Sequence, residues 1–447
     1  MKRLRSNPGL VLFLGAFLVF NSNCRPIPSG DTIGAALLPV RIALERTLDL
    51  DTYAPALVRA YDGDAYFLHW KGGHAYSAYP ITLSLLVSPL YLPVAWLPNV
   101  RAWRPELVFL LARTLEKLMA SLIAAASAAC LFLLLRPLMS QRRALLLAAV
   151  YAFATNTWST SSQALWQHGP SQLAIVLSLL CLQAFLEEPR PWKAAGAGLF
   201  AALGPALRPT DVFFFAVSVA VLGLLARRAG LLRWYALFGA LCGGALVAYN
   251  LWMFGHLRGG YTQPLDAPLW TGLAGILLSP SHGLLVFSPV LAFALVGAWR
   301  WLREPPARGR EVYAIALLFS LAHLLVYAKW RIWWGGDCYG PRMMADALPC
   351  LVLLLGPALD AITLSRPARA AFAAALLVSL AVQGVGAFCF PAGFDRANAL
   401  WDWRRCPIVT NARAGPARVH YRALALWARQ LSSGQRPDWT GTPLRLR

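Results

Sequence analysis

Long apolar blocks, separated by short polar or basic segments, run along nearly the whole chain. Most blocks contain 14 to 21 residues, close to the roughly 17 to 25 residues of a membrane-spanning helix. The pattern predicts an all-α polytopic membrane protein with about 11 transmembrane helices. We expect these helices at residues 10–20, 118–135, 144–157, 173–186, 194–207, 212–226, 234–254, 284–301, 312–328, 343–362 and 370–390.

Two apolar stretches allow a second interpretation. The block at 10–20 follows a basic start, as in a signal peptide, but the residues after it make a poor cleavage site, and we expect a retained helix. Residues 81–97 contain Pro89 and Pro93 and end before Pro98. These prolines favour a juxtamembrane or re-entrant helix over a crossing.

The basic residues predict the orientation of the helices. With eleven spans and the N-terminus inside, every short loop expected on the cytoplasmic side carries at least two Lys or Arg residues. Membrane insertion favours this bias. A crossing at 81–97 would instead place the later basic loops outside, so we expect an N-in, C-out topology.

The composition agrees with a membrane protein and gives the charge a meaning. Hydrophobic residues make up 58% of the chain and charged residues 14%, with a mean hydropathy of +0.52, whereas soluble domains are about 45–50% apolar and about 25% charged. This excludes a soluble enzyme. The net charge of +21 would suit nucleic acid, but no Lys/Arg cluster with interleaved aromatics exceeds a loop's length. We expect no nucleic-acid partner and attribute the charge to topology, membrane lipid and phosphate binding.

Two long segments fall on the expected outer side. We predict a transmembrane domain at 1–390, whose outer loop at 22–106 is far longer than an ordinary helix connection, and an Arg-rich tail at 391–447. The tail holds ten Arg, three Asp and no Lys or Glu. Its amphipathic stretch at 419–431 either lies on anionic lipid or caps the outer loops.

Shorter elements are predicted around these segments. The outer loop is expected to hold a helix at 37–48 and a hairpin at 66–77, with paired glycines in its turn, and residues 105–117 are expected to form a helix that returns the chain to the membrane surface. A surface helix is expected at 269–278. Of the outer cysteines, Cys338 and Cys406 would tie the last outer loop to the tail if they pair. No CxxC, HExxH, Walker or dinucleotide motif is present, and we expect neither a metal nor a cofactor.

Asp31 is the first candidate for proton transfer. It follows the first span closely, Gly30 permits a tight turn before it, and no Lys or Arg is adjacent in sequence. A carboxylate beside apolar walls can act as a base. The alternative is an N-cap, because Ser29 and Asp31 precede a helical stretch. Asp49 and Asp51 are also in positions typical of N-cap residues.

Cations and aromatic residues on the outer side form the remaining candidates. The loop at 161–170 is rich in hydrogen-bonding groups, and the loop at 329–342 combines Trp, Arg and Gly. Arg suits phosphate, and Trp suits a sugar ring or an isoprenoid, although an interfacial aromatic belt would also place Trp and Lys here. The phosphate-binding candidates are Arg208, Arg258, Lys329, Arg331 and Arg342, with Arg208 also able to pair with Asp211. The sugar- or acceptor-binding candidates are Trp166, Gln167, His168, Trp333, Trp334 and Tyr339.

The arrangement resembles the GT-C superfamily of integral-membrane glycosyltransferases. The long first outer loop with an early acid, the juxtamembrane helices and the many later spans match that class. A bacterial branch, the phospholipid-carrier-dependent or family 39-like enzymes, is resembled more specifically. The segments that carry this resemblance are Ser29-Gly30-Asp31-Thr32, Trp166-Gln167-His168-Gly169, Trp334-Gly335-Gly336 and Tyr339-Gly340-Pro341-Arg342.

The resemblance implies an inverting glycosyltransferase of the cell envelope. Asp31 would be the catalytic base, with Asp337 as the reserve acid, and the donor would be a polyprenyl-phosphate-linked sugar. The acceptor, whether lipid, glycan or protein, stays open. The resemblance also implies a bacterial inner (plasma) membrane, with the active site facing the periplasm or exterior.

Two other functions remain alternatives. A polymerase or ligase of lipid-linked glycans shares outward Arg clusters and aromatic loops, but would place its main catalytic loop late in the chain. A polytopic transporter would have a similar number of spans, but tends to show repeated halves, which this chain lacks.

Overall fold

The computed structural model describes residues 7–225, 228–261, 263–306, 308–390 and 399–417. In these ranges the chain is helical apart from one two-stranded hairpin. Six helices are long and apolar enough to cross a membrane, which indicates an integral membrane protein. They span Leu107–Leu135, His168–Glu187, Gly230–Phe254, Arg310–Lys329, Arg342–Thr363 and Arg366–Cys389.

These six helices coincide with six of the eleven predicted spans. The other five predicted spans are shorter or broken. The prediction at 284–301 fails as one helix, because the chain leaves the helical path at Ser288 and a new turn begins at Pro289, which cannot donate a backbone hydrogen bond. Four are short elements: α2 (Pro8–Asn21), α7 (Gln141–Phe153), α9 (Pro191–Leu207) and α10 (Val212–Ala220) with the π-helical η6 (Val221–Leu225).

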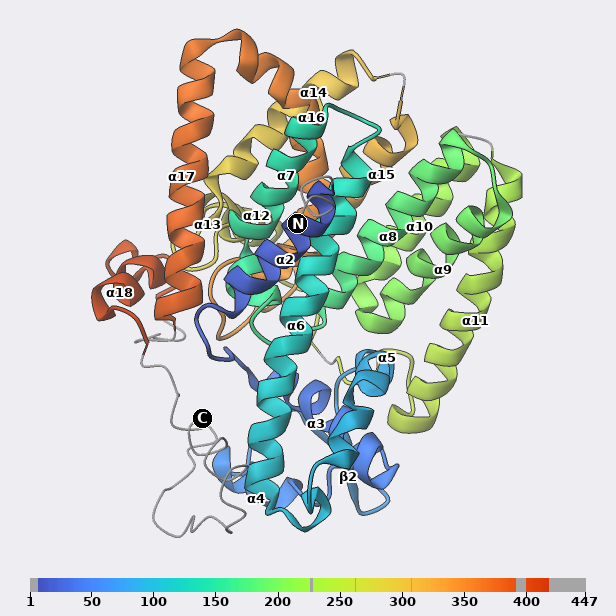
Figure 1. Cartoon of the computed structure of the whole chain (residues 1–447), viewed down its shortest axis with the longest axis vertical. Helices are drawn as coiled ribbons and strands as arrows, with labels where there is room; N and C mark the ends of the chain where they lie inside the picture. Colours follow the sequence, from blue (N-terminus) through green and yellow to red (C-terminus); the bar gives the residue numbers. More distant parts are fainter. Residues whose placement is uncertain (1–6, 226–227, 262, 307, 391–398, 418–447) are drawn as a thin grey trace.

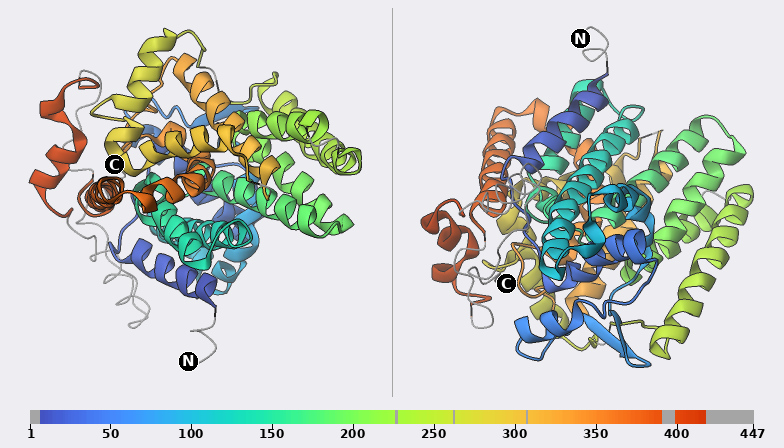
Figure 2. Two further views of the ribbon diagram at one scale, coloured as in Figure 1. Left: turned by 90° about the horizontal axis from the view of Figure 1, so that it is seen from above. Right: turned by 60° about the horizontal axis from the view of Figure 1, so that its bottom comes forward.

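The elements of residues 22–106, the predicted outer segment, lie together at one end of the molecule, the bottom of Figure 1. In the right-hand view of Figure 2, where this end comes forward, they lie in front of the long helices. The elements are η1 (Gly30–Thr32), α3 (Ile33–Glu45), α4 (Ala54–Ala60), β1 (Leu68–Lys71), β2 (His74–Ser77), α5 (Thr82–Tyr91), η2 (Leu92–Trp96) and η3 (Val100–Ala102).

The remaining elements form the bundle and the described part of the tail. They are α6 (Pro105–Leu135), η4 (Thr157–Ser161), α8 (His168–Glu187), η5 (Pro209–Asp211), α11 (Ala229–Phe254), α12 (Leu269–Leu278), α13 (Leu284–Phe287), η7 (Pro289–Ala292), α14 (Phe293–Arg303), α15 (Arg310–Lys329), η8 (Arg342–Ala347), α16 (Leu348–Leu364), α17 (Arg366–Cys389), η9 (Trp403–Arg405) and α18 (Pro407–Ala414).

Helix α6 joins the outer segment to the bundle. It begins at Pro105, whose fixed φ suits the first helical position, and its 31 residues make it about 46 Å long. The sequence predicted a surface helix at 105–117 and a separate span at 118–135, whereas the structure shows one continuous helix. Near Val108 and Ala112 α6 packs with α3, and between Ala124 and Phe132 it packs with α2 and α8.

The outer segment has a hydrophobic core of its own, in which Leu37, Leu50, Phe67 and Tyr91 are fully buried. The predicted hairpin is confirmed. Leu68 pairs with Ser77 and Lys71 with His74, while Gly72 and Gly73 both have positive φ, as the two-residue turn of a hairpin requires. The predicted helix at 37–48 is α3, which begins four residues earlier.

Three other predictions can be compared with the structure. The expected surface helix at 269–278 is α12, with the predicted ends. Residues 81–97 form α5 and η2 rather than one long helix. Both Cys338 and Cys406 are buried free thiols, and the Cys406 thiol donates to the carbonyl of Pro280 (2.9 Å), so the two do not form a disulfide. The tail helix predicted at 419–431 lies outside the described residues.

Candidate functional site

Asp31 lies on η1, where the outer segment meets the bundle. The turn is capped by Ser29, whose hydroxyl accepts from the Asp31 backbone N–H (3.3 Å), and Thr32 completes the capping box. The cap role considered for Asp31 therefore belongs to Ser29. Gly30 allows the ring of Tyr66 to lie directly against this turn, since a Cβ at this position would collide with the Tyr66 ring.

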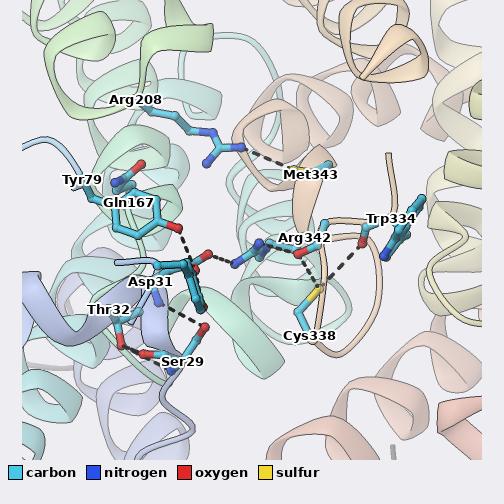
Figure 3. Close-up of polar contacts among 12 residues, drawn as sticks. Ser29, Asp31, Thr32, Tyr79, Gln167, Arg208, Trp334, Cys338, Arg342 and Met343 are labelled. Atoms are coloured by element: carbon cyan, nitrogen blue, oxygen red, sulfur yellow. Dashed lines mark hydrogen bonds and ion pairs between the residues drawn. The ribbon is translucent and has the colours of Figure 1, made fainter. Parts of the chain in front are cut away.

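The Asp31 carboxylate is held by three side chains, of which Tyr79 and Arg342 are labelled in Figure 3. Tyr66 and Tyr79 both donate to Oδ1, at 3.0 and 2.9 Å. Arg342 Nη1 donates to Oδ2 at 2.6 Å and forms an ion pair across 311 residues of sequence. The segments at 22–106 and 329–342 are thus joined at this carboxylate.

These contacts keep Asp31 ionised. Burial alone would raise the pKa of its carboxyl, but the charge and hydrogen bond of Arg342, with the two tyrosine hydroxyls, outweigh burial and lower the pKa below its ordinary value. The same carboxylate and burial raise the pKa of Tyr66 and Tyr79 well above the usual range of phenols. The group is therefore a carboxylate flanked by two neutral hydroxyls at neutral pH.

Arg342 begins η8 and makes two further contacts. Its guanidinium lies over the Trp166 ring, with 4.5 Å between Cζ and the ring centroid, and its Nη2 donates to the carbonyl of Gly335. Gly335, Gly336 and Gly340 have φ of 82°, 75° and 76°, a region that glycine enters without strain. These glycines turn the loop so that a carbonyl faces Arg342.

A second cation, Arg208, lies in the same region, which also contains three tyrosines, Tyr79, Tyr261 and Tyr327. The Tyr79 and Tyr261 rings meet edge to face at 5.9 Å, and the Tyr261 hydroxyl donates to Gln167 Oε1. Arg208, at the end of α9, donates to the Tyr327 hydroxyl and to Met343 Sδ (3.6 Å). Figure 3 shows Arg342 beside Asp31, and Arg208 above Gln167 in the same view.

Arg208 is held by a buried cluster of one acid, Asp346, and two histidines. Its Nε lies 2.5 Å from Asp346 Oδ2, so its ion-pair partner is Asp346 rather than the neighbouring Asp211. His168 Nδ1 lies 3.0 Å from the other oxygen of Asp346, and His323 Nε2 lies 3.8 Å from Oδ2. Because η8 carries Arg342 at one end and Asp346 near the other, one short turn positions both guanidinium groups.

A further ion pair supports η1 from α6. Arg113 Nη1 lies 2.7 Å from Glu116 Oε2 and 3.0 Å from the Thr32 hydroxyl. The second oxygen of Glu116 accepts from the backbone N–H of Leu165 at 3.1 Å. Glu116 is fully buried. The Arg113–Glu116 pair on α6 therefore contacts both the turn that contains Asp31 and the loop that precedes Trp166.

The structure brings together six of the sequence candidates, Asp31 among them. Arg342 contacts both Asp31 and Trp166, Gln167 joins them through Tyr261 and Tyr79, and Arg208 and His168 share the buried Asp346. The other four charged candidates are exposed or half-buried. Asp337 and Arg258 are exposed, Lys329 is half-buried in the last turn of α15, and Arg331 is exposed and paired with Asp266 (Nε–Oδ1 3.0 Å).

The three aromatic candidates of the last outer loop pack into the protein. Trp333 is buried against Gly275 of α12, and Trp334 meets it edge to face at 5.6 Å. Tyr339 packs on Phe287 at 5.0 Å and donates to the carbonyl of Val382 at 2.8 Å. These contacts fix the loop that carries Arg342.

Several groups of the site were missed by sequence reasoning. Tyr66, Tyr79 and Tyr261 are single tyrosines in outer loops and carried no distinguishing signal. Asp346 did carry one, since it lies inside the predicted span at 343–362, and an ionisable residue within a span is a sign of function. Glu116 lies at the edge of another predicted span and offered a similar signal.

In the part of the chain that the structure describes, no group of three or more His, Cys, Asp and Glu side chains is arranged to hold a metal ion. No known family model matches the chain, and no curated protein matches it.

Proposed function

We propose that the chain is an inverting glycosyltransferase that moves a sugar from a polyprenyl-phosphate donor to an acceptor at the outer membrane face. One observation carries this proposal: an ionised carboxylate, Asp31, lies in contact with Arg342, and a second buried guanidinium, that of Arg208, lies nearby. Glycosyl transfer from a lipid phosphate needs a base for the acceptor and positive charge for the leaving phosphate. The resemblance to the GT-C superfamily supplies the donor class.

In the proposed reaction, Asp31 takes the proton of the acceptor hydroxyl. The acceptor oxygen forms a bond to the anomeric carbon of the sugar from the face opposite the phosphate. The bond between that carbon and the phosphate oxygen breaks, and its electron pair leaves with the polyprenyl phosphate. Arg342 and Arg208 stabilise the charge that grows on this phosphate.

Arg342 changes partner in this scheme. Without donor, its Nη1 binds Asp31, so the base and a phosphate-binding cation neutralise each other. A donor phosphate competes for the same guanidinium. When it takes Arg342, Asp31 loses its strongest stabilising partner, and the pKa of its carboxyl rises. Donor binding therefore makes Asp31 a stronger base.

Trp166 and its neighbours are suited to the sugar. The Trp166 ring lies under Arg342, and Gln167, Tyr79 and Tyr261 add hydrogen-bonding groups beside it. Sugars bind in proteins through aromatic faces combined with directional polar groups. Trp333 and Tyr339, in contrast, serve to fix the loop.

The test is transfer of radiolabelled sugar from a panel of polyprenyl-phosphate sugars by the purified protein in lipid. We expect Asp31→Asn to lower the transfer rate by about 10²–10⁴-fold, the usual contribution of a general base. Asp266→Asn is the matched control, because Asp266 is also an outer acid paired with an arginine but lies apart from Asp31. Wild-type transfer that survives in Asp31→Asn would contradict the proposal.

A further inference from the structure

A cavity lies at the end of the bundle opposite the outer segment. It has a volume of about 230 Å³ and lies between α7, α14, α15 and α16, whose ends meet at the top of Figure 1. Arg342 and Asp360 are separated by 18 residues of η8 and α16, which corresponds to roughly 27 Å along a helix. The cavity is therefore distinct from the site at Asp31.

Two guanidinium groups line the cavity, and neither is firmly neutralised. Arg143 Nη1 lies 2.6 Å from Asp360, but this pair is well exposed to solvent. Arg300 lies 4.0 Å from Glu304, whose side chain is almost fully exposed. Exposed ion pairs of this kind contribute about 0–1 kcal/mol. An anion that enters the cavity can therefore replace Asp360 or Glu304 at small cost.

The surrounding charge favours such an anion. The chain segments that contribute lining residues and their neighbours, 136–143, 300–313 and 360–369, contain nine Arg against three acids, Glu304, Glu311 and Asp360. The field of so many like charges raises the local concentration of anions. Glu304 and Asp360 already lie in the cavity lining, and the net charge of the three segments is strongly positive.

The other walls of the cavity are apolar apart from one hydroxyl. Leu138, Met139 and Pro357 form part of the lining, and Tyr313, itself buried, brings its phenol to it. Pockets for drug-sized molecules have volumes of roughly 300–1,000 Å³, so this cavity suits a compact headgroup rather than a whole lipid. Arg binds phosphate through two parallel hydrogen bonds. The apolar walls suit the first methylene groups of an acyl chain, next to its ester bond with glycerol.

We propose that this cavity binds the phosphate group of an anionic lipid headgroup, with Arg143 and Arg300 as its ligands. Arg143 exchanges the carboxylate of Asp360 for the phosphate, and Arg300 supplies the second cation. The position at the ends of membrane-length helices places the cavity where headgroups lie. Free inorganic phosphate has the same chemistry, so the test includes it as a separate arm.

The test uses the full chain in a neutral detergent and measures its thermal unfolding by tryptophan fluorescence. A ligand that binds only the folded protein raises the unfolding temperature. Phosphatidylglycerol, phosphatidylcholine and inorganic phosphate are each titrated. The variant is Arg143→Gln with Arg300→Gln. The matched control is Arg303→Gln, on the same helix as Arg300, because the Arg303 guanidinium stacks on Trp299 (4.8 Å) and does not line the cavity.

We expect phosphatidylglycerol to stabilise the wild type and Arg303→Gln, and to bind the double variant at least roughly tenfold more weakly, a difference of about 1.4 kcal/mol. Phosphatidylcholine, which carries no net charge, should have little effect. If inorganic phosphate alone gives the same variant-dependent shift, the phosphate site stands and its source is soluble. Equal binding by the double variant and the wild type, or no shift in the wild type, overturns the proposal.

A second variant keeps the test decisive if the double variant does not fold. Asp360→Asn removes the internal competitor of the phosphate while leaving both arginines in place. It should bind phosphatidylglycerol more tightly than the wild type, by roughly threefold to tenfold. Unchanged or weaker binding by Asp360→Asn would contradict the exchange at Arg143.

Discussion

Two Arg–Asp pairs at opposite ends of the molecule have the same N–O distance of 2.6 Å, Arg342 with Asp31 and Arg143 with Asp360. They differ in their surroundings. The side chains of the first pair are 12% and 20% exposed, and those of the second are 37% and 56% exposed. Asp31 also accepts from two tyrosines, whereas water surrounds much of Asp360.

The N–O distance alone therefore does not determine how much an ion pair contributes to stability. In the less polar surroundings of Asp31, attraction between the charges is stronger, but removing either partner leaves the other poorly solvated. At Asp360, water replaces a lost partner readily. A third pair, Arg208 with Asp346, extends the series, since its side chains are 10% and 0% exposed.

The largest effect on stability is expected at this third pair. Asp346→Asn keeps the volume of the side chain but leaves the buried Arg208 charge without its partner, and should lower the free energy of unfolding by about 3–5 kcal/mol. Unfolding in detergent measures the change. The double variant with Arg208→Gln should recover part of this loss, because the unpaired charge is then removed. Simple addition of the two single effects would show that the pair is not coupled.

The pH dependence of kcat/KM reports the pKa of Asp31 in the free protein, and that of kcat reports its pKa in the donor-bound protein. Because the pKa of Asp31 is lowered in the free protein, kcat/KM should stay constant down to about pH 4, the ordinary range of an Asp carboxyl. Once the donor takes Arg342, the pKa of Asp31 rises, so the acid limb of kcat should lie at higher pH than that of kcat/KM. Coincident limbs would show that Arg342 does not change partner.

The same lowered pKa links Asp31 to stability. A group whose folded-state pKa is depressed stabilises the fold above its unfolded pKa, about 3.9 for Asp, and loses that contribution as the pH falls through the folded value. The Asp31 pair should therefore contribute fully at neutral pH and be lost only in strong acid. Asp31→Asn should remove this part of the acid dependence of unfolding.

The smallest effect is expected at the exposed pair. Arg143→Gln should change the free energy of unfolding by no more than about 1 kcal/mol in the absence of added lipid, because both partners remain solvated. The same unfolding measurement that detects the loss in Asp346→Asn serves here. A loss as large as that at Asp346 would mean that exposure does not separate the two ends of the molecule.

Part of the fold was predictable because it depends on local pattern. Gly72 and Gly73 between aromatic arms specify a hairpin turn, and the long apolar blocks specify the six membrane-length helices. The failure at 284–301 is also local, since hydropathy alone does not register the break at Pro289. The one continuous helix of α6 was missed because polar residues such as Glu116 and Lys117 interrupt its apolar pattern, while their buried partners lie far away in sequence.

The site was less predictable because it is assembled across long sequence separations. Asp31 and Arg342 could each be chosen by chemistry, but their contact spans 311 residues and has no sequence signal. A pair of Arg208 with its neighbour Asp211 was the alternative to a phosphate-binding role, whereas the fold supplies Asp346 as the ion-pair partner. Composition also does not tell apart Trp166, which lies beneath Arg342, from Trp333, which packs on α12.

In the proposed reaction Asp31 acts as the base, and Arg342 binds the phosphate of the donor. The most direct test of these two roles is to measure donor binding and transfer on the same proteins, using a labelled polyprenyl-phosphate sugar with wild type, Asp31→Asn and Arg342→Gln. The account predicts that Asp31→Asn binds donor at least as tightly as wild type, because Arg342 is released, yet transfers poorly, and that Arg342→Gln loses donor binding. Full transfer by Asp31→Asn, or undiminished donor binding by Arg342→Gln, would contradict it.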